Sequence, residues 1–449
     1  MAIINSIKRS LIIVFTAATS LSAQEIAPED STSGEVESEV ENPPTPSIEP
    51  ILQTNPDDGS VRAGFGALGP TFFLGRRIRL STSVTGGYND NVNQLPTGSP
   101  SWYANPNAVF TYEFGNARLA WNLVAGAGIT YYFAHPQGRD YDPDIHLSLS
   151  LAYKATERLT LNLTAFAAYQ SQPDLTTGFT ANRQLGNFFR STDGISAHYK
   201  WTPRFSTVTS ATLNVIEYES SSASSLNRTE SSFGEEGRYL LFPTTTLTGE
   251  YRFGVTAYQQ NSSRDSTTNS LSAGFDQTFS PHLEGSLRAG AQFRSSDKGG
   301  GGQSSPYLET LLHYTFERSG APTYVIWSNR YGLEESDLPN GTSRETFRTN
   351  LQAVYGITPR ISATLGLTYS HGDSVQSSVS NSLGGQSSTE TIFDISPGVR
   401  YLITRQLSIN AGYRYTKSDR GSGREIITNL QSIRSYTRNV YFAGLTYTF

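Results

Sequence analysis

The feature that most constrains this chain is a two-residue alternation of apolar and polar side chains that returns along most of its length. Between residues 159 and 169, every second residue from Leu159 onward is Leu, Ala or Tyr, with Thr160, Asn162 and Thr164 in between. Residues 361–369 and 407–415 repeat the pattern. Because successive side chains of a strand point to opposite faces, each run predicts a strand whose two faces meet different surroundings.

Short and long connections alternate between these runs. The short ones share a sequence pattern, seen in Tyr-Lys-Trp-Thr-Pro-Arg at 199–204 and Tyr-Gly-Ile-Thr-Pro-Arg at 355–360. Proline fixes φ and cannot donate to a sheet, so these patterns predict strand ends, each preceded by an aromatic residue. The long connections are rich in Ser, Asn and Gly. Residues 76–449 are therefore predicted to form about 18 strands, within a range of 16–20, joined as antiparallel hairpins.

Composition decides between a soluble sheet protein and a membrane barrel. Aromatic residues reach 12% and charged residues only 16%, against the ~25% charged residues of typical soluble domains. In a transmembrane barrel, alternate residues of each strand face lipid and a polar interior. The chain has no cysteine, so disulfides cannot stabilise it. We therefore predict an all-β, transmembrane, antiparallel up-and-down β-barrel, located in the bacterial outer membrane of a Gram-negative cell.

The first 75 residues differ from the rest. Lys8 and Arg9 precede a short apolar run and small residues that lead to Ala23, which predicts a signal peptide over residues 1–23. Residues 24–75 are acidic and Pro-rich, which predicts a disordered periplasmic linker. Ten acidic residues lie between Ser10 and Val61, and 29 acidic and 32 basic residues remain from Gly59 onward. The linker is expected to be a tether or docking segment, with a plug in a basic lumen as the alternative.

The last nine residues form a strongly amphipathic strand. Tyr441, Ala443, Leu445, Tyr447 and Phe449 share one face. This pattern resembles the C-terminal signal of bacterial outer-membrane barrels, which the barrel-assembly machinery reads. An ordinary amphipathic final strand is the alternative. As a barrel end, the strand is expected to pair with the strand beginning near Ile78 and to turn its aromatic face toward lipid.

Residues 73–92 carry a second resemblance. A basic strand entry is followed by Gly87-Tyr88-Asn89-Asp90-Asn91-Val92, and the segment is similar to the opening strand of a family of outer-membrane β-barrel porins associated with capsular and exopolysaccharide systems. Asn89 stands where that family more often has Asp, which weakens any role needing three acidic ligands. The resemblance implies an outer-membrane location and a role in the passage or export of glycans.

Charged residues on the polar faces are the candidate functional groups. A charge facing lipid costs ~2–4 kcal/mol at the membrane midplane, so inward placement is expected. These residues would either form the transverse field of a porin constriction or stiffen the wall as an ion-pair network. The candidate lumen residues are Glu250, Arg252, Asp276, Glu284, Arg288, Arg294, Glu309, Glu317, Arg348, Asp394, Arg400 and Arg414.

Other chemistry finds little support in the sequence. Asn89-Asp90-Asn91 offers oxygen ligands for Ca²⁺, but turn formation explains the same residues. The six histidines are scattered and no Gly-x-Ser-x-Gly, HExxH or Walker motif occurs, so we expect no catalytic residues, cofactor, metal or nucleic-acid partner. Lys417, Arg420, Arg424 and Arg434 flank the last long connection, where lipopolysaccharide is a possible partner besides membrane lipid.

Two functions remain open from the sequence. The first is a porin-like passage for small polar solutes or an exported polysaccharide through a hydrated lumen. The second is a non-conducting structural or assembly barrel, whose residues 24–75 anchor periplasmic partners of an envelope or exopolysaccharide system.

Overall fold

A computed structural model describes residues 75–136, 140–171, 186–221, 223–260, 262–296, 302–318, 321–335, 341–376, 388–420 and 435–449. The predicted signal peptide and the predicted linker, apart from Gly75, lie outside these residues. Within them, no helix has the length and hydropathy needed to cross a membrane.

The described chain is built almost entirely from strands. Two short 3-10 turns, η2 (Ser224–Leu226) and η3 (Ser262–Arg264), interrupt the connections that follow β7 and β9. The strands are β1 (Gly75–Asn89), β2 (Ser101–Gly115), β3 (Leu119–Tyr132), β4 (Tyr141–Lys154), β5 (Leu159–Gln170), β6 (Phe188–Lys200), β7 (Phe205–Tyr218), β8 (Arg228–Phe242), β9 (Thr245–Tyr258), β10 (Ser266–Ser280), β11 (Leu283–Ser296), β12 (Gly302–Arg318), β13 (Ala321–Glu334), β14 (Gly341–Thr358), β15 (Ile361–Gln376), β16 (Ser388–Leu402), β17 (Leu407–Arg420) and β18 (Tyr436–Thr448).

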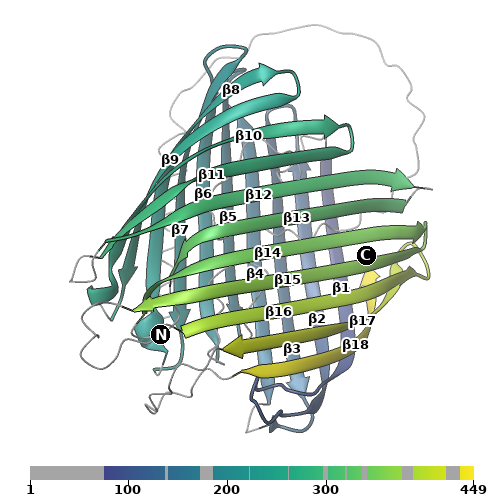
Figure 1. The fold of residues 1–449 in the computed structure, drawn as a ribbon. Coiled ribbons are helices and arrows are strands. Elements are labelled where there is room, and N and C mark those ends of the chain that lie inside the picture. Colours follow the sequence, from purple (N-terminus) through teal and green to yellow (C-terminus); the bar gives the residue numbers. More distant parts are fainter. Residues whose placement is uncertain are drawn as a thin grey trace, which may run out of the picture. The chain divides into compact units, whose positions relative to one another are not determined.

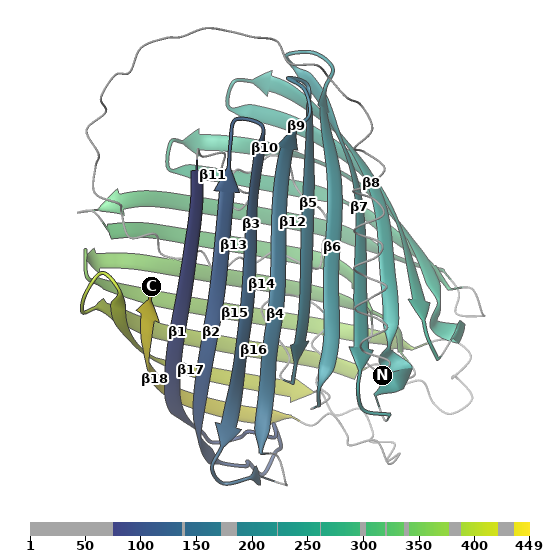
Figure 2. The same ribbon diagram turned by 180° about the vertical axis from the view of Figure 1, so that it is seen from behind.

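These strands form one closed antiparallel sheet. Each strand pairs with its neighbours in sequence, and β18 returns to pair with β1 (Figures 1 and 2). At this seam Tyr88 lies opposite Tyr441, and the backbone nitrogen of Phe449 donates to the Leu80 carbonyl at 2.8 Å. The predicted all-β barrel of about 18 strands is thus confirmed, as is the pairing of its last strand with its first.

The barrel has two unlike ends. Connections of two to four residues join strands at one end, the short-turn end, whereas the other end, the long-loop end, has connections of five to seventeen residues. In the repeated short turns a threonine hydroxyl accepts a backbone N–H three residues later, from Phe205 to Thr202 at 2.9 Å and from Ile361 to Thr358 at 3.0 Å. The Thr-Pro-Arg pattern is therefore the sequence of a capped turn.

The outer face of the barrel is apolar on most strands. Ile78, Val84, Ile145 and Leu445 alternate with inward polar residues and are each more than half exposed. The aromatic residues that the sequence places before the short turns point outward, with Tyr153, Tyr355, Tyr401 and Phe279 all exposed. An apolar outer wall with an aromatic border is the surface expected of a barrel in lipid.

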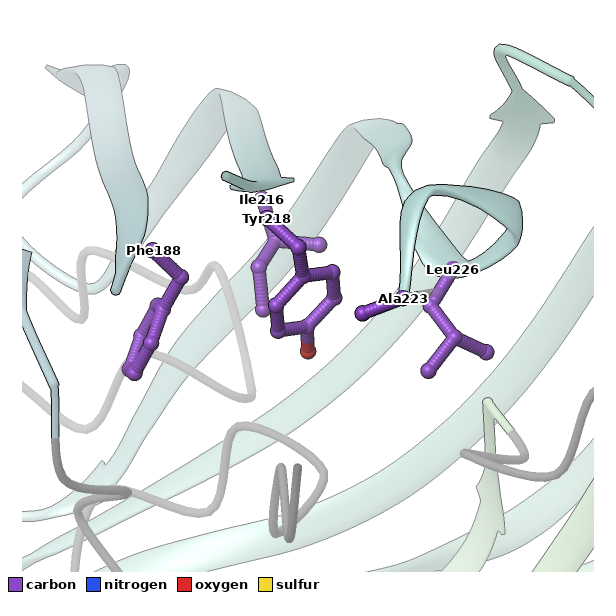
Figure 3. Packing of buried hydrophobic residues seen from close by; sticks show 5 residues of the cluster. All are labelled: Phe188, Ile216, Tyr218, Ala223 and Leu226. Carbon is purple, nitrogen blue, oxygen red and sulfur yellow. The ribbon is translucent and has the colours of Figure 1, made fainter. Parts of the chain in front are cut away.

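A small hydrophobic cluster stabilises the long-loop end. Phe188 of β6 and Ile216 and Tyr218 of β7 pack with Ala223 and Leu226 of the following connection (Figure 3). Asn227 completes the contact, because its side-chain oxygen accepts the backbone N–H of Tyr218 at 2.8 Å. This connection is therefore folded back on β6 and β7.

Candidate functional site

The register of the sheet turns eleven of the twelve predicted lumen residues toward the inside of the barrel. Arg288 lies opposite Glu309 and Gly274, and Asp394 lies opposite Thr368 and Thr416, on the face away from the exposed apolar residues. Of Glu317 only the backbone is described, opposite Pro322. The inward face is therefore polar, and the arrangement of its charges decides what it can do.

Four side chains of β8, β10 and β11 form a closed ring of charges. Arg238 bonds Glu236 at 2.6 Å and Asp276 at 2.5 Å, while Arg288 bonds Asp276 at 2.7 Å and Glu236 at 3.4 Å. Arg288 is fully buried and also donates to the carbonyl oxygens of Phe275 and Leu287. Each carboxylate thus bridges two guanidinium groups, and the ring is neutral.

A second group surrounds Glu335, just beyond the end of β13. Its carboxylate receives two bonds from Arg294, at 2.5 and 2.8 Å, and one each from Tyr258 at 2.8 Å and Thr256 at 3.1 Å. Burial opposes the ionisation of Glu335, but Arg294 and Arg228 lower the pKa of its carboxyl below the ordinary glutamate value. The connection after β13 is therefore held to β9 and β11 by a buried charge.

A third group joins β13, β14 and β16. Arg344 lies 2.8 Å from Glu390 and 3.6 Å from Glu334, which in turn accepts from Arg348 at 3.1 Å. Next to it, on β16 and β17, Asp394 pairs with Arg414 at 2.8 Å and accepts from Thr416 at 2.6 Å.

The remaining predicted residues differ in their surroundings. Glu250 and Arg252 pair with each other, Glu284 lies 2.9 Å from His313, and Glu309 accepts from Tyr307. No ion pair to Arg400 occurs among the described residues. Most of the predicted charges are thus neutralised within the wall, and Arg400 is an exception.

Several members of these groups were not predicted, namely Glu236, Arg238, Glu334, Glu335, Arg344 and Glu390. Glu235 and Glu236 are adjacent on β8, so one of them must face outward, and no apolar alternation on this strand indicates which. Glu334 and Glu335 lie where a strand passes into a connection. For β8, the spacing of Glu230, Glu236 and Arg238 could have indicated the inward face, because residues an even number of positions apart in a strand lie on the same side.

The opposite side of the barrel has a different lining. Inward positions of β2–β7 carry mainly amides and hydroxyls, including Asn105, Asn107, Asn122, Asn162 and Asn214. Their charged inward groups lie mostly near strand ends, as Asp142 and Lys154 do on β4. β1–β7 and β9–β16 occupy opposite sides in both views (Figures 1 and 2). We call these linings the neutral wall (β2–β7) and the ionic wall (β8–β17).

A polar cavity lies along the inner face from β7 to β13. Its volume is about 160 Å³. Its charged lining is balanced, with four arginines and four glutamates: Arg228, Glu230, Glu250, Arg252, Arg294, Arg330, Glu334 and Glu335.

The Asn89-Asp90-Asn91 segment acts as a structural clamp. Asp90 accepts the backbone N–H of Asn439 at 2.7 Å and its side-chain amide at 2.6 Å, and Asn91 donates to the Thr437 carbonyl at 2.8 Å. The Asn89 side-chain oxygen accepts from Asn91 and Arg438. The side-chain oxygens of Asn89 and Asp90 therefore accept hydrogen bonds from Arg438 and Asn439 of β18 and help to close the barrel seam. In the described ranges, no group of three or more His, Cys, Asp or Glu residues is placed to hold a metal.

The basic residues around the last long connection are only partly described. Lys417 is half-exposed in the outward register and lies 3.7 Å from Asp419. Arg424 and Arg434 lie outside the described residues, as does the side chain of Arg420. A contact with lipopolysaccharide at these positions stays a prediction.

A family model described as "Putative beta-barrel porin 2" matches residues 77–449 of the chain. Comparison with curated proteins gives no match. Among solved structures, the barrel is similar to the outer membrane protein OpdK of Pseudomonas aeruginosa, with 11% identity, a TM-score of 0.42 and coverage of 84% of this chain and 100% of that one. It is also similar to the siderophore receptor PirA of Acinetobacter baumannii (10%, 0.43, 84% and 81%) and to OccAB3 of the same organism (11%, 0.40, 83% and 99%).

Proposed function

The chain belongs to this β-barrel porin family, and from that premise we propose that its lumen gives passage to small polar solutes or to an exported polysaccharide. The protein is a bacterial outer-membrane β-barrel of porin type. The association with capsular or exopolysaccharide export is part of the proposal, and no catalysis is proposed.

One observation carries this proposal: the lumen has a neutral wall of amides and hydroxyls and an ionic wall whose charges are largely paired with each other. Opposite charges within about 3 Å cancel at the distance of a passing solute, so the net field across the lumen is weak. Amides and hydroxyls offer hydrogen bonds to uncharged polar molecules. This combination favours sugars and other neutral polar solutes over ions of either sign.

Conductance in planar bilayers tests the proposal. The purified protein should give stable open steps with weak ion selectivity. Arg400→Glu, which reverses a charge that forms no ion pair with any described residue, should shift the reversal potential toward cations, and Arg348→Glu should do so as well. Lys417→Glu is the matched control, because Lys417 faces outward, and it should leave the reversal potential unchanged.

The alternative, a non-conducting barrel that anchors partners through residues 24–75, makes the opposite prediction. Silence at all voltages, both for the whole protein and after deletion of residues 24–75, would contradict passage. Swelling of proteoliposomes in a neutral disaccharide provides a second readout that does not depend on ions.

A further inference from the structure

At the short-turn end, the part of the rim formed by β1–β7 is basic. These strands lie side by side in Figure 2. Their exposed basic side chains come from β1, β4 and β6 and from the turns before β3, β5 and β7. We call this set the basic mouth: Arg77, Arg118, Lys154, Arg158, Lys200 and Arg204. Among the described groups here, the opposing charges are Glu157 and the terminal carboxylate of Phe449, because Glu113 is paired with Arg79 at 2.7 Å.

Backbone hydrogen bonds fix the three turn arginines. The carbonyl oxygen of Arg118 accepts the backbone N–H of Lys154 at 2.7 Å, and that of Arg158 accepts the backbone N–H of Lys200 at 2.8 Å. The next hairpin bonds the carbonyl oxygen of Arg204 in the same way, at 2.8 Å. The side chains take no part in these bonds. Within the described ranges, no carboxylate forms an ion pair with Arg118, Arg158, Lys200 or Arg204.

The register places the basic mouth on the lumen side of the wall. Lys154 lies opposite Thr160 and Lys200 opposite Ser206, on the polar face of their strands, whereas the neighbouring Tyr153 is exposed on the outer face. Each turn arginine directly precedes the first residue of its strand, which is apolar and faces outward. The head groups of membrane lipids lie outside the barrel. The basic mouth is therefore better placed for an anionic ligand that approaches the opening.

The long-loop end has the opposite charge. Most exposed charged side chains described there are acidic, and Lys417 is an exception. The acidic ones are Asp140, Asp144, Glu219, Asp373 and Asp419. An anionic ligand is attracted to the short-turn end and repelled from the other.

The chain itself carries a segment of matching charge. Residues 25–58 contain ten carboxylates and neither Lys nor Arg. They precede β1, whose first residue, Gly75, lies opposite Gly115 at the short-turn end. The residues between Asp58 and Gly75 can span up to about 53 Å. Six strand spacings, from β1 to β7, amount to about 29 Å. The whole basic mouth is thus within reach of residues 25–58.

We propose that residues 25–58 dock on the basic mouth of the same chain. Single ion pairs at a surface are weak, but here many carboxylates meet six basic groups. Covalent attachment next to the mouth gives the segment a high effective concentration there. Salt weakens contacts of this kind, because exposed charges are screened. The docking does not depend on whether the lumen conducts.

Carbodiimide coupling of carboxylates to lysine amines tests the docking in the full-length protein. Lys154 and Lys200 should become joined to residues 25–58, whereas Lys417, at the long-loop end, is the matched control and should not. The segment has no Lys or Arg before Arg62, so trypsin leaves its carboxylates on one peptide that mass spectrometry identifies. The yield should fall at least tenfold in about 1 M salt, where the Debye length is only about 3 Å.

Two double variants separate charge from shape. Arg158→Glu with Arg204→Glu should lower the coupling yield at Lys200 at least fivefold, because both changes repel the segment. Arg158→Lys with Arg204→Lys keeps the charge and should keep the yield. Heat-modifiable mobility checks that each barrel is folded. If the glutamate variant does not fold, the salt dependence in the native protein decides the question.

The proposal fails if Lys154 and Lys200 couple no more than Lys417, or if the yield does not change with salt. Coupled products of mixed isotopic composition, from a mixture of labelled and unlabelled protein, would show docking on another copy and would contradict it. Loss of the coupling in low-salt vesicles that contain phosphatidylglycerol, with the coupling retained in vesicles of phosphatidylcholine, would assign the basic mouth to lipid phosphates instead.

Discussion

Gly87 is a residue at which the barrel seam admits no side chain. A Cβ atom built there would overlap the Tyr441 carbonyl oxygen and lie 2.6 Å from the Tyr103 hydroxyl. We expect Gly87→Ala to push β1 away from β18 and to lower the free energy of unfolding by about 1–3 kcal/mol, the usual cost of overpacking. Urea unfolding in lipid vesicles, followed by tryptophan fluorescence, measures it.

The neighbouring glycine is the control for this change. At Gly86 an added Cβ meets only the Tyr103 carbonyl oxygen, at 3.8 Å. Gly86→Ala should therefore leave the unfolding midpoint close to that of the native protein. Equal effects of the two substitutions would show that the seam does not depend on the close approach at Gly87.

For single residues, the sequence did not predict which distant side chains become hydrogen-bond partners. Asn89-Asp90-Asn91 left turn formation and Ca²⁺ binding as alternatives. The structure commits Asp90 to Asn439, which is 349 residues away in the chain. No local pattern indicates such a partner, because the contact exists only once the first and last strands meet. The same holds for Arg294 and Glu335.

At the scale of the element, the strands could be predicted because the two-residue alternation of apolar and polar side chains is visible within a few consecutive residues. β5 and β17 alternate apolar and polar residues, so a few apolar side chains show which face of each strand points outward. β8 lacks such a pattern, since Glu235, Glu236 and Arg238 place charge on both faces. Its contribution to the ion-pair ring was missed for that reason.

The closing strand makes its own prediction. Phe449 packs against Tyr447 with ring centroids 4.7 Å apart, and its backbone N–H, not its ring, bonds Leu80. We expect Phe449→Ala to preserve the seam hydrogen bonds but to reduce insertion by the barrel-assembly machinery several-fold. The folded fraction in cell membranes should fall, whereas refolding from urea into detergent should stay near native efficiency. A parallel loss in both assays would argue for a purely structural role.

The stability that Glu335 gives to the connection after β13 should depend on pH. Its pKa is lowered in the folded protein, so the stability from this contact is complete above the ordinary glutamate value of 4.5 and is lost as the pH falls through the folded value. Glu335→Gln should remove about 3 kcal/mol near neutral pH, as expected for a broken buried pair. Thermal midpoints of the native and variant barrels should converge in acid. Parallel curves would contradict this prediction.

At the scale of the whole molecule, the difference between the neutral wall and the ionic wall arises only when the sheet closes into a barrel. The sequence predicted about 18 strands and inward charges, because the order of the hairpins and the alternation of side chains can be followed along the chain. It did not predict that β2–β7 and β8–β17 would form a neutral and an ionic wall. Which strands face each other follows from closing eighteen strands into one sheet, and pairing such as Arg238 with Asp276 then cancels charges that the sequence shows separately.

The two-wall lumen can be tested by adding one charge to its neutral side. Asn162 of β5 faces inward and donates to Ser196 at 3.3 Å. Asn162→Asp keeps the shape of the side chain and adds a charge that no arginine of β5 neutralises. At roughly 5 Å in water, a unit charge attracts a cation by about 0.8 kcal/mol. An anion is repelled by the same amount, so the cation-to-anion permeability ratio should rise about 16-fold. Asn162→Ser should leave that ratio unchanged, which separates charge from shape. If Asn162→Asp folds and conducts with native selectivity, the neutral wall does not border the path of the ions.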